Sequence, residues 1–364
     1  MVKRNYGIDL LRILSMYMVL ILHVLGQGGI LGATEKFSAH YWTAWFLEIS
    51  VYCAVNCFAL ISGFVMCNSK PKVSKLAELW LQTAVYTVSF TVLFFFLVPE
   101  TRGWFALLDA VMPITRKHYW YISAYFGLYL LVPLLNAAIA KIEKRTFGIS
   151  LLAMFVLFSV LPTMLRSEPY KIGKGYSLIW LCLLYLAGAY MNKYRIPEKI
   201  KKRWAWLVFF ASVVLTFLSK VAIEYLTREW LGKPMFGDTF VDYVSPTIVL
   251  AALSLFVACS KLTFPPAINK IIAWFAPAAL GVYLIHVCIP VWKNVIKNFS
   301  VSFVEHSVPV MVLVVLGSAL GLYLLCSLIE RLRIQIFQWL RIRVLCLKIE
   351  EWVHRGLAKL FPIK

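Results

Sequence analysis

The chain of 364 residues is dominated by apolar side chains, which make up 61% of it, whereas only 15% of its residues are charged. A soluble domain is about half apolar and about a quarter charged, so this composition excludes an ordinary soluble fold and indicates a lipid environment. The net charge of +20 does not indicate nucleic-acid binding, because the basic residues gather at the ends of apolar runs and form no soluble basic face.

Ten apolar runs have about the length needed to cross a bilayer. They lie at roughly 8–30, 42–67, 77–98, 119–140, 147–165, 176–192, 204–226, 244–260, 271–292 and 308–329. The stretch 103–114 is too short to span, so we expect it either to lie on the surface or to re-enter the membrane. The sequence therefore predicts an all-α, polytopic membrane helix bundle of about ten transmembrane helices.

The charges between the runs indicate how the bundle is oriented. If the N-terminus is cytoplasmic, the inside segments carry about twice as many lysines and arginines as the outside segments, and most acidic loop residues fall outside. We therefore expect a multi-pass protein of the cell membrane with both termini in the cytoplasm.

Two regions follow from this layout, a transmembrane domain at 1–330 and a basic tail at 331–364. The tail alternates arginine and lysine with large apolar residues, which predicts an amphipathic helix that contacts lipids of the inner leaflet. A partner-binding helix is the alternative. The eight cysteines lack the spacing of a zinc site, and no other metal site is expected.

The first apolar run carries three polar residues, Asp9, Arg12 and His23, which are costly in hydrocarbon and therefore candidates for function. Arg12 and His23 fall on one helix face, about 16 Å apart along the axis, so they can hold two ends of one long ligand. Asp9 lies on the same stripe and can pair with Arg12. The alternatives are an interfacial ion pair for Asp9 and Arg12, and a structural hydrogen bond for His23.

Two further intramembrane residues lie at a depth similar to that of His23. They are Glu48, in a run that enters from outside, and His286, in the ninth run. We expect Glu48 to orient His23, and His286 to face the donor or the acceptor of a reaction. Structural hydrogen bonds are the alternative for both.

Four sequence blocks, in order, resemble the acyltransferase-3 family of integral membrane acyltransferases. They are the Arg12-x10-His23 spacing, 58–64 (Phe-Ala-Leu-Ile-Ser-Gly-Phe), 119–122 with 129–133, and 281–286 (Gly-Val-Tyr-Leu-Ile-His). The members that the chain looks most similar to are O-acetyltransferases of surface polysaccharides.

The resemblance implies a membrane O-acyltransferase with cytoplasmic acyl-CoA, most simply acetyl-CoA, as a co-substrate and no bound cofactor. The acceptor would be a hydroxyl of a cell-surface or lipid-linked glycan, with His23 as general base or as the site of an acyl-histidine. Arg12, Lys72 and Lys75 would bind the donor. The two lysines stand where members often carry Arg-x-x-Arg, and they lack its bidentate geometry.

Trp120, Tyr121 and Tyr125 fall where the fourth run meets the outer surface, which suits either stacking on a sugar or an aromatic belt. The chain either presents its own acceptor site or relies on a separate extracellular protein. Two other functions remain open, a proton-coupled transporter and a membrane anchor or sensor. No internal repeat and no pair of broken helices is visible to favour transport.

Overall fold

The computed structural model describes the backbone of residues 4–99, 103–116 and 118–360, and within these ranges every regular element is helical. The all-α prediction is therefore confirmed. The α-helices are α1 (Tyr6–Leu25), α2 (Ile30–Ala33), α3 (Ala39–Val51), α4 (Ala54–Met66), α5 (Val73–Leu97), α6 (Trp104–Val111), α7 (Trp120–Lys141), α8 (Lys144–Phe155), α9 (Leu161–Leu165), α10 (Leu178–Lys193), α11 (Ile196–Lys199), α12 (Lys202–Leu231), α13 (Pro246–Ser260), α14 (Pro266–Phe275), α15 (Ala279–His286), α16 (Ile289–Val291), α17 (Val308–Trp339) and α18 (Ile342–Leu360).

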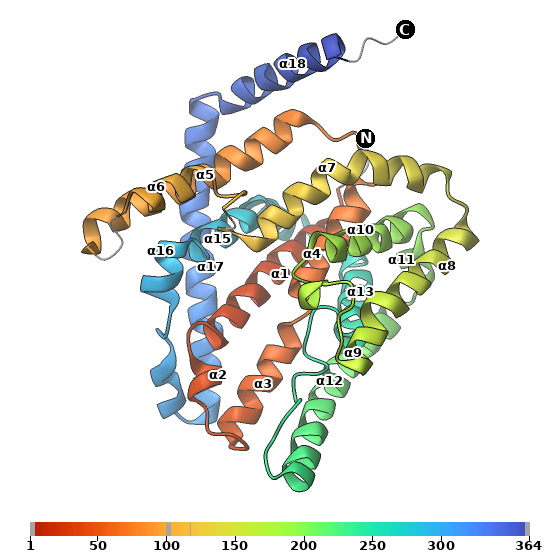
Figure 1. Cartoon of the computed structure of the whole chain (residues 1–364), viewed down its shortest axis with the longest axis vertical. Coiled ribbons are helices and arrows are strands. Elements are labelled where there is room, and N and C mark those ends of the chain that lie inside the picture. The colour runs from red at the N-terminus through yellow and green to blue at the C-terminus, as the bar shows by residue number, and fades with distance from the viewer. Residues whose placement is uncertain (1–3, 100–102, 117, 361–364) are drawn as a thin grey trace.

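Eight helical stretches in the described residues are long and apolar enough to cross a membrane, and α10 and α13 are two shorter apolar helices. Each of the ten predicted runs overlaps one of these ten stretches, so the layout of about ten spans is confirmed. Both chain ends and α18 lie at one end of the molecule, whereas α2, the start of α3 and the far end of α12 lie at the other (Figure 1). The helix α1 contacts α3, α4, α13, α15 and α17, and is therefore the central helix of the bundle.

Several spans are broken, a feature that the sequence analysis did not detect. The first is interrupted at residues 26–29, the second at Tyr52 and Cys53, and the ninth after His286. Irregular backbone at membrane depth is tolerated only where protein or a cavity surrounds it. We therefore expect the backbone groups at these breaks to be surrounded by protein or to line a cavity.

The described part of the segment between α5 and α7 first lies along α5 at the periphery (Figure 1), with Phe105 and Leu108 exposed, and enters the interior at Tyr119. The helix α6 packs against α5, and the Oγ1 atom of Thr87, in the middle of α5, lies 2.6 Å from the carbonyl oxygen of Ala110. Tyr119 is only 1% exposed, and its hydroxyl donates a hydrogen bond of 2.8 Å to the carbonyl oxygen of Leu284. The helix α7 consequently begins in the interior and not at the outer surface.

Two glycines bring α4 and α10 into close contact. A Cβ atom on Gly63 would lie 1.9 Å from the carbonyl oxygen of Tyr185, and one on Gly188 would lie 2.2 Å from that of Leu60. Only glycine fits at both positions, and the two helices form one rigid wall of the bundle.

The C-terminal region consists of two helices. The helix α17 continues to Trp339, so the predicted tail begins inside it, and the separate amphipathic helix α18 begins at Ile342. The first half of α18 packs against α5, where Cys346 is fully buried, whereas Trp352 and Leu360 remain exposed. The distal half of α18 thus presents apolar side chains on its surface, and its contact with lipid stays a prediction.

Candidate active site

A cavity of about 230 Å³ lies beside the central helix. Arg12, Met16, Val19 and His23, which follow one another on a single face of α1, form one of its walls. The helices α4, α7 and α15 supply the other walls, mostly with apolar and aromatic side chains. Arg12 and His23 thus share a cavity, as their spacing predicts.

The two histidines of the first and ninth spans meet at this cavity. Nδ1 of His23 lies 2.8 Å from Nε2 of His286, and Nδ1 of His286 lies 2.6 Å from the carbonyl oxygen of Val282. A carbonyl only accepts, so Nδ1 of His286 carries its proton and, in a neutral ring, Nε2 accepts from Nδ1–H of His23. In this protonation pattern, the lone pair on Nε2 of a neutral His23 takes no part in the hydrogen bond between the two histidines.

Both histidines lie at helix ends, where the chain bends around them. The amide of Gly28 donates a hydrogen bond of 2.9 Å to the carbonyl oxygen of His23, closing the last turn of α1, and His286 is the last residue of α15. The ring of Trp292 meets that of His23 edge-on, with centroids 4.7 Å apart. The His23 ring is therefore fixed by His286 on one side and by Trp292 on another.

Glu48 does not orient His23, and the expectation that it would is corrected here. The described residues give Glu48 no hydrogen bond with His23, and His286 occupies Nδ1 of His23 instead. Glu48 is 8% exposed, and its Oε2 atom has no partner within the described part of the chain. Counting depth along a span misplaced it, because depth gives the level of a residue in the membrane but not the direction that its side chain faces.

Arg12 lies at the wall of the same cavity and remains partly exposed. Its Nη1 atom lies 2.7 Å from Oδ1 of Asp9, whose other oxygen is 2.5 Å from Nε of Arg4. The predicted pair with Asp9 therefore exists. It holds Arg12 at the cavity wall, so the ion pair and a ligand-binding role are compatible.

The two lysines lie outside the cavity lining. Nζ of Lys75 pairs with Glu78 at 2.6 Å, and the backbone amide of Lys72 donates a hydrogen bond of 2.9 Å to the hydroxyl of Tyr129. Tyr125, one helical turn before Tyr129 on α7, lines the cavity. Lys72 therefore lies beside Tyr129, one helical turn of α7 beyond the cavity lining.

The three aromatic residues predicted for the outer surface lie in the interior, because α7 begins there. Trp120, Tyr121 and Tyr125 all line the cavity of His23. The ring of Trp120 contacts that of Tyr176 at 4.6 Å, and Tyr121 stacks on Tyr125 at 6.1 Å. An aromatic belt at the membrane surface therefore does not account for these residues.

One of the comparisons with known proteins gave a match. The acyltransferase-3 family model, described as an acyltransferase domain, matches residues 5–328, nearly the whole chain. The chain belongs to the acyltransferase-3 family. No curated protein and no solved structure matches it. With its apolar spans, this member of the family is a multi-pass membrane acyltransferase.

Two residues with notable contacts in this acyltransferase, the buried Glu330 and the partly buried Trp292, were not singled out by the sequence analysis. Glu330, on α17, is fully buried, accepts a hydrogen bond of 2.6 Å from the hydroxyl of Tyr86, and pairs with Arg333. It stands where the last apolar run meets the basic tail, a position that the sequence analysis did not interpret. The i,i+3 spacing of Glu330 and Arg333 was the available signal. For Trp292, nothing in the local pattern indicates its contact with His23.

Proposed function

We propose that this acyltransferase transfers an acyl group, acetyl in the simplest case, from acyl-CoA to a hydroxyl of a cell-surface or lipid-linked glycan. The observation that carries the proposal is the chain from the Val282 carbonyl through His286 to His23, at the wall of a cavity that also contains Arg12. This arrangement prepares one imidazole nitrogen to accept a proton beside a site that a long anionic ligand can enter.

In the proposed step, Nε2 of His23 takes the proton of the glycan hydroxyl as its oxygen attacks the thioester carbonyl carbon. The new C–O bond forms, the C–S bond breaks, and the sulfur leaves with the proton returned by His23. The products are an ester and the free thiol of coenzyme A. His286 accepts from Nδ1–H of His23 throughout and keeps the ring in the productive tautomer, as the carboxylate does in a hydrolase triad.

Donor binding is assigned to the end of the cavity at Arg12. Arg12 and His23 are separated by about 16 Å along α1, which suits a donor with its anionic end at Arg12 and its thioester at His23. Lys72 forms no ion pair among the described residues, whereas Lys75 is paired with Glu78. Lys72 is therefore the lysine better placed to add to the attraction for phosphates.

The test measures transfer from radiolabelled acetyl-CoA in membrane vesicles, and the ester content of surface glycans by mass spectrometry. His23→Ala is expected to lower transfer by at least about 100-fold, since it removes the general base. His306→Ala is the matched control, because this exposed histidine lies outside the cavity, and it is expected to retain full activity. Full activity of a folded His23→Ala protein discards the scheme.

The helix breaks also occur in transporters, so a proton-coupled carrier is the second candidate. Donor dependence separates the two functions. A transporter moves its solute in vesicles that contain no acyl-CoA, and it leaves surface glycans without new esters.

A further inference from the structure

A second cleft, of about 310 Å³, lies between the end of α9 and the loop that follows α12. Its lining is rich in charges of both signs and in hydroxyl groups. The residues that carry them are Thr163, Arg166, Glu168, Lys174, Asp238 and Asp242. So polar a lining, in contrast to the mostly apolar and aromatic lining of the His23 cavity, suits a ligand that is itself rich in hydrogen-bonding groups.

The ion pairs across this cleft are long and open to solvent. Nζ of Lys174 lies 3.3 Å from Asp242 and 3.5 Å from Asp238, and Arg166 lies 3.9 Å from Asp238. The side chains of Arg166, Lys174 and Asp238 are about half-exposed. Exposed pairs of this kind contribute little to stability, so these groups can exchange their partners for the hydroxyls of a ligand.

One polar group at the cleft is left without a partner. Thr163 is only 5% exposed, and its hydroxyl forms no hydrogen bond within the described residues. Buried hydroxyls in folded proteins are almost always paired with protein, water or ligand. The Thr163 hydroxyl is therefore available to donate a hydrogen bond to a ligand or to water in the cleft.

The cleft and the cavity of His23 share their dividing wall. Lys174 lines the cleft, and Tyr176, two residues later, lies with its ring 4.6 Å from that of Trp120 in the cavity. Likewise, Asp242 lines the cleft, whereas Tyr243 lines the cavity. The rings of Tyr176 and Tyr243 are 4.9 Å apart, so a single layer of aromatic side chains separates the two spaces.

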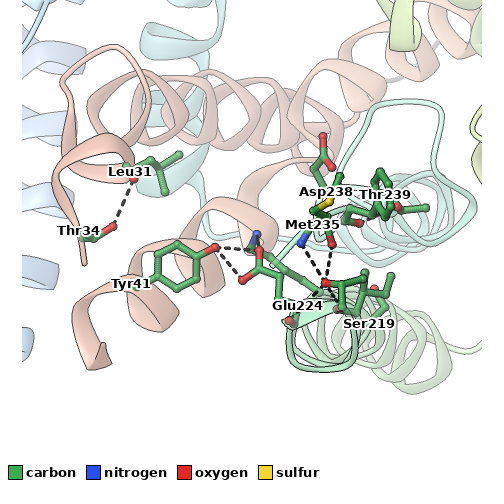
Figure 2. A network of polar contacts seen from close by, with 12 residues as sticks. Leu31, Thr34, Tyr41, Ser219, Glu224, Met235, Asp238 and Thr239 are labelled. Atoms are coloured by element: carbon green, nitrogen blue, oxygen red, sulfur yellow. Dashed lines mark hydrogen bonds and ion pairs between the residues drawn. The ribbon is translucent and has the colours of Figure 1, made fainter. Parts of the chain in front are cut away.

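The loops that carry this wall are held firmly in place. Gly175 has φ of +96°, and a Cβ atom there would lie 2.6 Å from Cβ of Tyr243, so the two loops are in direct contact. The loop after α12 is anchored by the hydrogen bond of 2.9 Å from the amide of Met235 to the hydroxyl of Thr227. Figure 2 shows Met235 in this loop, with the carboxylate of Asp238 pointing away from it. The cleft is therefore largely formed before any ligand arrives.

We infer that this cleft, with Trp120, Tyr176 and Tyr243, is the subsite that binds the acceptor glycan. The inference rests on the proposed acyl transfer at His23. Carboxylates accept hydrogen bonds from sugar hydroxyls, the basic groups donate to sugar oxygens, and the aromatic rings cover an apolar sugar face. Because both acidic and basic groups line the cleft, it suits a neutral sugar. The aromatic layer lies between this sugar and His23, so its side chains must move apart for the hydroxyl to be acylated.

The experiment uses surface glycan purified from cells that lack the gene, with radiolabelled acetyl-CoA as donor, and measures the KM of each. Asp242→Asn and Lys174→Met are each expected to raise the glycan KM at least about tenfold, and to leave the acetyl-CoA KM unchanged. Asp109→Asn and Arg116→Met are matched controls. These two residues form an exposed ion pair, with 2.6 Å between Nε of Arg116 and Oδ1 of Asp109, and neither lines the cleft. The two control variants are expected to change neither constant.

Lys174→Arg, which retains the charge, is expected to keep the glycan KM near that of the unmodified protein, and it distinguishes a lost contact from a misfolded loop. An unchanged glycan KM in both Asp242→Asn and Lys174→Met overturns the subsite, and so does an equal rise in the acetyl-CoA KM. Absence of transfer by the unmodified protein, in contrast, contradicts the proposed function itself.

Discussion

At the scale of single residues, one backbone carbonyl determines how the histidine pair is protonated. The oxygen of Val282 fixes the proton on Nδ1 of His286, and that ring in turn fixes the proton on Nδ1 of His23. His286 is thus a positioning residue in the proposed reaction, because it acts through His23. Its loss and its conservative replacement are expected to have different effects.

We expect His286→Ala to lower kcat by about 100-fold or more, because the His23 ring loses the acceptor that holds its tautomer. His286→Gln is expected to retain more activity, since an amide oxygen can still accept from Nδ1–H. The measurement is kcat at saturating acetyl-CoA, with thermal stability as the control for folding. Equal activities for the two variants contradict the positioning role.

The second residue-scale prediction concerns Asp242, in the loop between α12 and α13. Burial raises the pKa of this carboxyl from 3.8 to about 6, and the nearby Lys174 opposes the rise, whereas Asp238 and Glu168 add to it. Below that pH the carboxyl is protonated and no longer attracts Lys174 or accepts hydrogen bonds as a carboxylate. The glycan KM is therefore expected to increase as the pH falls through about 6.

This pH dependence is checked by measuring the glycan KM of three proteins between about pH 5 and pH 8. Lys174→Met removes the opposing positive charge, so its inflection is expected at higher pH than that of the unmodified protein. Asp242→Asn is expected to lack the inflection. The same inflection in all three proteins excludes Asp242 as its source.

At the scale of helices, the wall made by α4 and α10 depends on the absence of side chains. Gly63→Ala and Gly188→Ala each place a methyl group against backbone atoms of the facing helix, at a cost of about 1–3 kcal/mol. Each variant is expected to lower the Tm by several degrees. Gly317→Ala and Gly321→Ala are matched controls on α17, where nothing lies within 4 Å of the added Cβ atom, and they are expected to leave the Tm unchanged or slightly higher. Similar losses in all four variants argue against close packing as the cause.

For the helices, the sequence predicted the number and position of the spans well but did not reveal the breaks within them. Bilayer thickness sets the length of an apolar run, so the ten spans were visible, and the helical repeat placed Arg12 and His23 on one face. The breaks in those spans depend on contacts with distant helices and leave little local trace. Depth along the spans placed both Glu48 and His286 level with His23, but it could not tell which of the two side chains faces it. The sequence also placed Trp120 at the surface, because nothing local shows that α7 begins in the interior.

At the scale of the whole molecule, the two ends of the bundle differ in the loops they carry. Lys297 lies in the connection between α16 and α17, on the side expected to be outside, whereas Lys199 is the last residue of α11, on the side expected to be cytoplasmic. The native cysteines offer little background for labelling, because seven are buried and Cys182 is partly so. Single added cysteines can therefore report the orientation.

A membrane-impermeant maleimide is expected to label Lys297→Cys in intact cells and Lys199→Cys only after permeabilisation. The physical reason is the excess of lysine and arginine on the Lys199 side, which retains those loops in the cytoplasm. The unmodified protein is the control for background labelling. The opposite pattern of labelling places the glycan cleft in the cytoplasm and contradicts the assignment of donor and acceptor sides.

The histidine pair has a further consequence for the energetics of the whole molecule. The histidine pair ends at the carbonyl of Val282, which cannot pass a proton onward. A proton that His23 takes up at Nε2 can therefore leave only from Nε2. By the proposed route, each turnover passes a neutral acyl group between the two compartments and carries no net charge through the bilayer. The membrane voltage then neither drives nor opposes the reaction, and the hydrolytic energy stored in the thioester alone sets its direction.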